Sequence, residues 1–165
     1  MMNAEFLQSH ALFGGISDKH MQDILPLLRE QTFSKGEFIV NEGEHGNRLY
    51  FICEGSVEVL KKAHSPEGII QRRLAVLRQG DTFGEMELID VQSRSASIKA
   101  LEPVSALTLR HEDMYKLYKR NLEAFTMIVM NIAREISRRL RNMDDLVGKG
   151  LDLRLQDEGR KSESV

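Results

Sequence analysis

The sequence has only one cysteine and no long apolar run, and both features limit the class of protein. The single cysteine, Cys53, excludes a framework of internal disulfides and is typical of a reducing cytoplasm. Cys53 lies in the apolar run Leu49–Cys53, where burial is expected rather than a reactive thiol. No stretch has the length of a membrane span, and the N-terminus lacks the basic and apolar segments of a secretory signal. We therefore predict a soluble, cytoplasmic protein.

The sequence also lacks an excess of charge of either sign. Its 23 Lys and Arg residues stand against 25 Asp and Glu residues, which gives a formal net charge of −2. A chain so close to neutrality has no general attraction for nucleic acid or for acidic membranes. Its 165 residues are enough for one domain with a substantial core and too few for two full domains.

Patterns that mark common catalytic sites are missing as well. There is no Gly-x-Ser-x-Gly elbow and no phosphate loop that ends in Gly-Lys-Ser/Thr. The five histidines are scattered, without the close spacing of a metal site: His10, His20, His45, His64 and His111. We therefore expect no enzymatic activity, no catalytic residues, no metal and no cofactor.

What is present is a change of pattern along the chain. Met21 and Ile24 indicate an N-terminal helix, which Pro26 should end or kink. From Thr32 to about Arg110 the sequence has short apolar runs separated by glycine turns. Many short strands at this spacing predict a small antiparallel barrel, roll or jelly roll.

Two turns are predicted inside this β region. Glu54-Gly55 separates the apolar runs around Tyr50 and Val57, which is the pattern of a hairpin. Lys61 to Gly68 is a polar stretch that contains a proline, and we expect it to be a loop.

The C-terminal part of the sequence is helical. We expect a short helix from Glu112 to Tyr118 and a longer one that begins at Asn121 as its cap. The longer helix carries one apolar stripe at steps of three and four residues: Phe125, Val129, Ile132, Ile136, Leu140, Met143 and Val147. This stripe either packs on the β region of the same chain or forms a seam with a second copy of it.

The residues after Val147 are expected to be a charged, flexible tail, 148–165, without a periodic helix. Leu151, Leu153 and Leu155 alternate with polar residues, which is the pattern of a short docking strand. Residues 156–165 are polar and terminal, so we expect disorder there.

The most informative motif is Phe83-Gly84-Glu85-Met86-Glu87-Leu88, followed by Arg94-Ser95-Ala96-Ser97. A short helix start offers backbone N–H groups to an anion, and Arg94 adds a cation that suits phosphate. Glu85 would repel phosphate, but an ionised carboxylate accepts a hydrogen bond from a hydroxyl. Together, these groups predict a site for a nucleotide with a compact sugar–phosphate.

These residues resemble the phosphate-binding cassette of the cyclic nucleotide-binding domain family. That family includes the bacterial catabolite activator, the regulatory subunits of cAMP-dependent kinase and cyclic nucleotide-gated channels. Its turn motifs are matched by Phe33-x-Lys35-Gly36-Glu37, Glu42-Gly43, Gly46-Asn47-x-Leu49-Tyr50-Phe51-Ile52 and Gly55-Ser56-Val57. The resemblance runs from about Leu12 to Leu146. It implies an α+β domain, residues 1–147, with an eight-stranded antiparallel β-roll (jelly roll), an N-terminal helix and a long C-terminal helix.

The resemblance also implies the site residues. Glu85 would accept the ribose 2′-hydroxyl, and Arg94 would bind the cyclic phosphate. Gly84, Ser95 and the backbone N–H groups of Glu85 and Met86 would complete the phosphate cradle. The full set that we expect to bind the ligand is Phe83, Gly84, Glu85, Met86, Arg94, Ser95, Ala96, Arg139 and Asn142.

The base is less well defined by the sequence. Counted without gaps from Arg94, the helix position that caps the purine in relatives falls near Arg139, and Asn142 is the next candidate. Arg139 would stack on the base or donate to its acceptor edge, or it is a solvated arginine on a basic face. Family frequency favours cAMP, and cGMP stays open.

The sequence departs from the family pattern at two places. Glu87 stands where a small residue is usual, and it would weaken anion binding if it pointed inward. Ser93 replaces a frequent proline before the arginine and makes the loop less rigid. Neither change removes a contact group, so we favour a functional nucleotide site.

The implied function is that of a stand-alone sensor. No DNA-binding, kinase or channel segment follows the long helix, so the response would come from a separate partner or a second subunit. Binding would close the C-terminal helix over the site. Two alternatives stay open: an interaction module with an empty or degenerate pocket, and a domain of a larger receptor.

Overall fold

The computed structural model of the protein describes residues 4–66, 68–89 and 92–162. The described elements are, in chain order, α1 (Ala4–Gln8), α2 (Asp18–Ile24), the 3-10 turn η1 (Leu25–Leu27), β1 (Arg29–Phe33), β2 (Phe38–Val40), β3 (Arg48–Glu54), β4 (Ser56–Ser65), β5 (Gly68–Arg78), β6 (Thr82–Phe83), α3 (Met86–Ile89), β7 (Ser97–Ala100), β8 (Val104–Arg110), α4 (His111–Arg120) and α5 (Leu122–Ser162).

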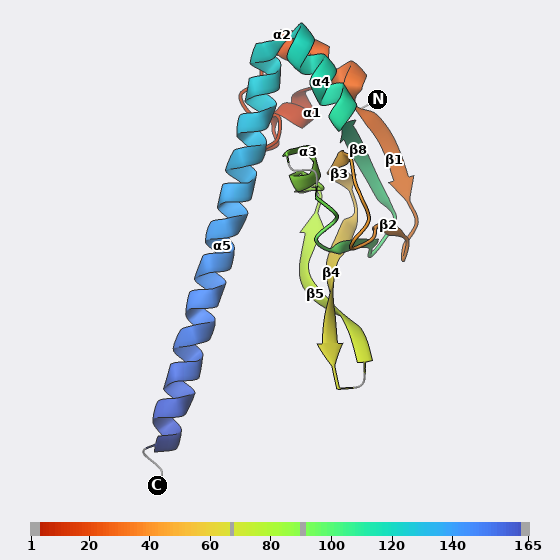
Figure 1. Cartoon of the computed structure of the whole chain (residues 1–165). Coiled ribbons are helices and arrows are strands. Elements are labelled where there is room, and N and C mark those ends of the chain that lie inside the picture. Colours follow the sequence, from red (N-terminus) through yellow and green to blue (C-terminus); the bar gives the residue numbers. More distant parts are fainter. Residues whose placement is uncertain (1–3, 67, 90–91, 163–165) are drawn as a thin grey trace.

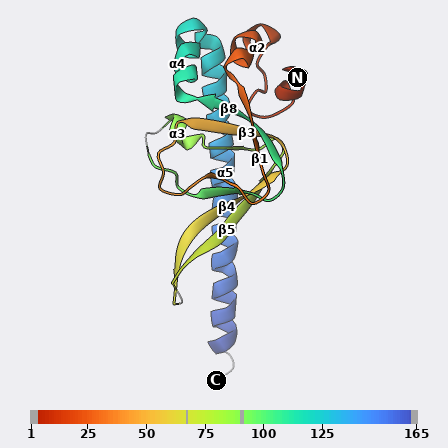
Figure 2. The same ribbon diagram turned by 90° about the vertical axis from the view of Figure 1, so that its right-hand side faces the viewer.

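The strands form two antiparallel sheets of four. One has the order β1-β8-β3-β6 and the other the order β2-β7-β4-β5. The N-terminal helices and α4 lie at one end of this roll, and α5 runs along one side of it (Figures 1 and 2). This arrangement confirms the predicted α+β fold with an eight-stranded β-roll, an N-terminal helix and a long C-terminal helix.

Strand β3 separates two apolar cores because its side chains alternate between its faces. Leu49, Phe51 and Cys53 pack with the helices on one face. Tyr50 and Ile52 point into the interior of the roll on the other. Burial of both faces explains why β3 is a continuous apolar run in the sequence. Cys53 is buried as predicted.

The hairpin predicted at Glu54-Gly55 is wrong. Strand β3 pairs with β6 and β8, and β4 pairs with β5 and β7, so the chain passes from one sheet to the other at this corner. Gly55 has φ +86°, and a Cβ at this position would approach the Pro103 carbonyl oxygen. Apolar runs on both sides of a glycine turn do not distinguish a hairpin from such a crossing.

The loop predicted from Lys61 to Gly68 is also wrong. Strand β4 continues to Ser65 and β5 begins at Gly68, with Ser65 paired to Gly68. This hairpin extends beyond the rest of the roll in both views (Figures 1 and 2). Its end lies outside the core, so polar side chains are tolerated there without interrupting the ladder.

Helix α5 begins as predicted, with Asn121 at its cap: the Ala124 N–H donates to Asn121 Oδ1 at 3.0 Å. The first part of its apolar stripe packs on the helical core, with Ile132 buried and Phe125, Val129 and Ile136 half-buried. The stripe therefore packs on its own chain over about the first four turns of α5.

The prediction that no helix follows Val147 is wrong, because α5 continues to Ser162. The alternation of Leu151, Leu153 and Leu155 suggested a strand, but Leu, Arg, Gln, Glu and Lys are all good helix formers. A glycine inside a helix costs only about 1 kcal/mol, so Gly148 and Gly150 do not end it. The domain boundary at residue 147 and the flexibility of 148–165 stay predictions.

Candidate functional site

The predicted cassette begins in β6, continues through α3 and ends at the start of β7, and the turn between β6 and α3 is built on glycine. Gly84 has φ +76°, a conformation that side chains disfavour. A Cβ on Gly84 would lie 2.5 Å from both the Arg48 carbonyl oxygen and Arg94 Nη1. The backbone of the turn therefore packs directly against the arginine that the sequence paired with it.

Arg94 is buried in the described structure, with 6% of its surface exposed. Its Nη2 donates to the Arg48 carbonyl oxygen at 3.2 Å, and its guanidinium carbon lies 6.0 Å from the centre of the Tyr50 ring. A side chain at Gly46 would overlap the guanidinium group. Gly46 and Gly84 thus make room for Arg94, which is a role that the turn pattern alone did not reveal.

The backbone of Arg94 is held by the loop that follows β2. The Arg94 N–H donates to the Glu44 carbonyl oxygen at 2.8 Å, and the Gly43 N–H donates to the Arg94 carbonyl oxygen at 2.9 Å. The Glu42-Gly43 motif and the arginine, about 50 positions apart in the sequence, therefore belong to one structure.

Glu85 is the second buried charged residue of the cassette, with 7% of its surface exposed. Its Oε1 accepts a hydrogen bond from Arg139 Nη1 of α5 at 2.9 Å. A buried carboxylate accepts hydrogen bonds and donates none, which suits a hydroxyl group of a ligand. Glu85 and Arg94 are thus both buried, and their roles toward a ligand stay predictions.

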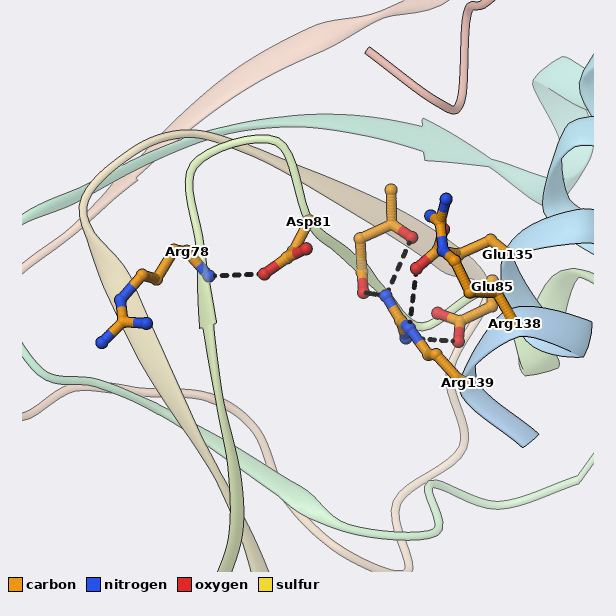
Figure 3. A network of polar contacts seen from close by, with 7 residues as sticks. Arg78, Asp81, Glu85, Glu135, Arg138 and Arg139 are labelled. Carbon is orange, nitrogen blue, oxygen red and sulfur yellow. Dashed lines mark hydrogen bonds and ion pairs between the residues drawn. The ribbon is translucent and has the colours of Figure 1, made fainter. Parts of the chain in front are cut away.

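Arg139 joins the long helix to this cassette. Besides Glu85, it donates through Nε to Glu135 Oε1 at 2.9 Å and through Nη2 to the Thr82 carbonyl oxygen. Figure 3 shows the Arg139 guanidinium between the carboxylates of Glu85 and Glu135, with Arg138 paired to Glu135. The sequence singled out Arg139 and missed Glu135 and Thr82, although Glu135 stands one helical turn before Arg139, the spacing of an ion pair.

The other predicted site residues differ in their burial. Phe83 is buried in the roll and stacks on Tyr50 with 4.6 Å between ring centres. Met86 is exposed at the start of α3, and Asn142 is exposed on α5. Ser95 and Ala96 follow Arg94 directly, and the Ser95 carbonyl oxygen accepts a hydrogen bond from Lys61. The side chain of Glu87 lies outside the described part of the chain.

A separate apolar cavity of about 420 Å³ lies where α3, α4 and α5 meet. Leu88 and Ile89 of α3 line it together with Tyr118 of α4 and Phe125 of α5. Glu85 and Arg94 do not line it, so it is distinct from the charged site. It provides an apolar contact between the cassette helix and the two C-terminal helices.

The described part of the chain has neither a clustered metal site nor a membrane-spanning helix. Within residues 4–66, 68–89 and 92–162, no three His, Cys, Asp or Glu side chains are grouped to hold a metal ion. No helix in that part of the chain combines the length and apolar character needed to cross a membrane.

The sequence of the chain is similar to known proteins and to one family model. Residues 30–121 match the family model of the cyclic nucleotide-binding domain. The chain is 31% identical over 138 residues to the cyclic AMP receptor protein of Thermus thermophilus, covering 84% of this chain and 61% of that protein. It is 32% identical over 116 residues to cGMP-dependent protein kinase, isozyme 1, of Drosophila melanogaster, covering 70% of this chain and 15% of the kinase.

A solved structure agrees with these matches. The crystal structure of a cyclic nucleotide-binding domain from Methylobacillus flagellatus superimposes with a TM-score of 0.77 at 25% identity. The alignment covers 88% of this chain and 80% of that one. The chain spans less than two thirds of the length of the two curated relatives.

Proposed function

The chain belongs to the cyclic nucleotide-binding domain family, and on that premise we propose that it binds a cyclic nucleotide through Glu85 and Arg94. The observation that carries the proposal is the burial of a carboxylate and a guanidinium in one cassette, around a glycine turn that fits no other residue. The guanidinium matches phosphate geometry, and the carboxylate accepts the ribose hydroxyl. Gly84, Ser95 and Ala96 complete the cradle.

We propose cAMP as the preferred ligand. The Thermus relative, which aligns with 84% of this chain, is named a cyclic AMP receptor. The Drosophila relative is named a cGMP-dependent kinase and aligns with 70%. Ser95 is compatible with either purine, so the wider match of the cAMP receptor supports the choice.

Arg139 supports a coupling between the ligand and α5. A ribose hydroxyl that reaches Glu85 competes with Arg139 Nη1 for the same carboxylate. If Glu85 binds the ligand instead of Arg139, it loses the hydrogen bond that joins α5 to the cassette at Arg139. The apolar cavity between α3, α4 and α5 offers space into which these elements can repack.

The output is proposed to pass through a second copy of the chain or a separate partner. Leu140, Met143 and Val147 continue the apolar stripe of α5 and are exposed. A row of large exposed apolar residues on a helix that extends past the domain suits a helix–helix seam. Helix α5 projects beyond the roll in both views (Figures 1 and 2).

Titration calorimetry with cAMP and cGMP tests the binding proposal. We expect cAMP to bind with the higher affinity and to raise the melting temperature. Arg94→Ala should weaken binding by roughly 10- to 100-fold, because a charge-assisted hydrogen bond contributes about 1.5–3 kcal/mol. Arg72→Ala, which removes an exposed arginine from β5, is the matched control. Absence of heat and of thermal stabilisation with both nucleotides would refute the proposal.

A thiol placed on α5 tests the coupling. In Ser137→Cys the new thiol lies on an exposed position of α5, while burial raises the pKa of the native Cys53 thiol to about 11 and keeps it unreactive. We expect saturating cAMP to change the labelling rate or the fluorescence of a probe at position 137. The same ligand should change it less when Arg139→Met is added, and an unchanged probe signal in the first protein would contradict the coupling.

The exposed part of α5 also supports the second candidate, an interaction module that assembles without ligand. Arg94→Ala separates the two functions. It should abolish the ligand response of a sensor, whereas the oligomeric state of an assembly module should be the same in Arg94→Ala and wild type, with and without nucleotide. Sedimentation velocity measures that state.

A further inference from the structure

A second polar cluster lies beside the cassette and has no part in the contacts of Glu85 and Arg94 described above. The Lys61 ammonium group, from β4, donates to the Ser95 carbonyl oxygen at 2.6 Å. The same group pairs with Glu42 Oε1 at 2.9 Å. The Lys62 N–H donates to Glu42 Oε2 at 2.8 Å, so both carboxylate oxygens are used. Glu42 therefore fixes Lys61, and Lys61 holds the carbonyl group of Ser95, the residue after Arg94.

The same loop holds the chain on both sides of Ser95. On one side lie the two backbone hydrogen bonds of Arg94 with Gly43 and Glu44. On the other, the Glu42 N–H donates to Ser97 Oγ at 2.9 Å. Between these anchors, Lys61 holds the carbonyl end of the peptide group that joins Ser95 to Ala96.

The orientation of that peptide group has a direct consequence for the site. A trans peptide is planar, and its C=O and N–H bonds point in opposite directions. The Ser95 carbonyl oxygen faces the Lys61 ammonium group, which is about half-exposed. The Ala96 N–H belongs to the same peptide group and therefore points away from Lys61.

We propose that Lys61, held by Glu42, is a positioning residue that directs the Ala96 N–H toward one exocyclic oxygen of a bound cyclic phosphate. This inference rests on the proposed function of the cassette. Lys61 acts through the backbone and does not contact the ligand. The Lys62 N–H and the Lys61 ammonium group keep the pKa of Glu42 below its ordinary value, so the carboxylate stays ionised at neutral pH and continues to hold Lys61.

Calorimetric titration of four proteins with cAMP is the first test. Lys61→Met should weaken binding about fivefold, the effect of one misdirected hydrogen bond. Lys61→Arg should restore most of the affinity, because a guanidinium can donate to the same carbonyl oxygen. Lys62→Met removes the same charge one residue away, from an exposed side chain, and should bind as wild type does. Equal weakening by both methionine variants would mean a general loss of positive charge and would overturn the proposal.

The two phosphorothioate diastereomers of cAMP make the test specific. In each of them sulfur, a weak hydrogen-bond acceptor, replaces one of the two exocyclic oxygens. Lys61→Met should weaken cAMP and one diastereomer by the same factor. It should leave unchanged the affinity for the other diastereomer, in which the oxygen facing Ala96 is already replaced. A purely structural role of Lys61 would weaken all three ligands alike.

The outcomes distinguish this proposal from the one it rests on. If wild type binds neither cAMP nor cGMP, both proposals fail; if it binds only cGMP, the phosphorothioates of cGMP replace those of cAMP. If wild type binds and Lys61→Met binds equally well, only the role of Lys61 fails. Thermal unfolding without nucleotide checks that each variant is folded. Glu42→Gln keeps Lys61 but weakens the ion pair that holds it. This variant should show the same difference between the two diastereomers, with a smaller change in affinity. If the two diastereomers do not differ in Glu42→Gln, the proposal is also contradicted.

Discussion

The two parts of α5 carry the same apolar periodicity and differ in what covers it. In the first part, Ile128 and Ile132 are almost fully buried against the helical core. In the second part, Leu140, Met143 and Val147 are 57%, 62% and 62% exposed. The sequence pattern does not change between the two parts, and the change lies in the neighbours that the fold provides.

This difference shows what an apolar stripe does and does not establish. The spacing identifies one face of a helix, whereas burial requires an opposing surface. The N-terminal helices, α4 and one face of the roll supply that surface near the start of α5, and Figure 1 shows the helix continuing past them. Leu140, Met143 and Val147 therefore continue the stripe of a packed helix, but within the described part of the chain none of them belongs to the helical core.

Truncation of a buried residue in the first part should cost the most. Ile128→Ala should lower the free energy of unfolding by about 2–5 kcal/mol, because it removes buried methyl groups and leaves a cavity in the helical core. Urea denaturation monitored by circular dichroism measures the change. A loss below 1 kcal/mol would mean that α5 is not firmly packed at this position.

Acid should destabilise the packed region through Asp113. This buried carboxylate accepts hydrogen bonds from Arg110 Nε at 2.9 Å and Lys116 Nζ at 2.8 Å, and these partners hold its pKa below its ordinary value. A carboxyl group with a lowered pKa stabilises the folded state above its unfolded pKa, and this contribution is lost as the pH falls through the folded pKa. We expect the free energy of unfolding to fall below about pH 4.

Asp113→Asn is the variant that isolates this contribution. It should cost about 1.5–3 kcal/mol at pH 7, the value of a hydrogen bond to a charged group, and the variant should lose less stability on acidification than wild type. Asp144→Asn, on the exposed part of α5, is the matched control and should leave the pH profile unchanged. Parallel pH profiles of wild type and Asp113→Asn would contradict the assignment.

Loss of the cap between α4 and α5 should have an intermediate effect. Asn121 accepts from the Ala124 N–H and also donates to Asp23 Oδ2 of α2 at 2.8 Å. Asn121→Ala should cost about 1 kcal/mol, as is usual for an N-cap. Asn121→Ser keeps the cap and loses the contact with α2, so its smaller cost measures that contact. If serine is as harmful as alanine, the contact with Asp23 outweighs the cap.

Truncation in the second part should have the smallest effect on the fold. Leu140→Ala is expected to change the free energy of unfolding of the monomer by less than about 0.5 kcal/mol, as for other exposed positions. At high protein concentration the same variant should weaken self-association, measured by sedimentation equilibrium. A monomer destabilised as strongly as Ile128→Ala would mean that this part of α5 packs within its own chain.

The cassette and most strands were predictable because their signals are local. A glycine followed by a carboxylate, with an arginine in the same loop, identifies Glu85 and Arg94 without knowledge of the fold. Alternating or continuous apolar runs identify β3 and β8 in the same way. The predicted cap at Asn121 depends only on the residues that immediately follow it.

Other features depend on contacts between distant segments. Whether Glu54-Gly55 joins two strands of one sheet or links two sheets is decided by β8 and β7, which lie about 50 residues further along the chain. The contact of Arg139 with Glu85 and Thr82 requires that α5 lie beside the cassette with Arg139 next to it. The role that we propose for Lys61 depends on the same kind of proximity, between β4 and the loop after Arg94.

The sequence by itself therefore determined the family, the β-roll, the two charged residues of the cassette and the apolar face of α5. The family and the eight-stranded roll follow from the resemblance of motifs along most of the chain. The charged residues and the apolar face follow from residue types at short spacings, which act through backbone geometry and side-chain chemistry close to the residue itself. Only the tertiary structure decided which part of that face is covered and which groups hold Glu85, Arg94 and Ser95. Those contacts join segments 30 to 60 residues apart. The contacts of Arg94 and Ser95 form inside the roll, whereas the contact of Glu85 requires α5 to lie beside the cassette.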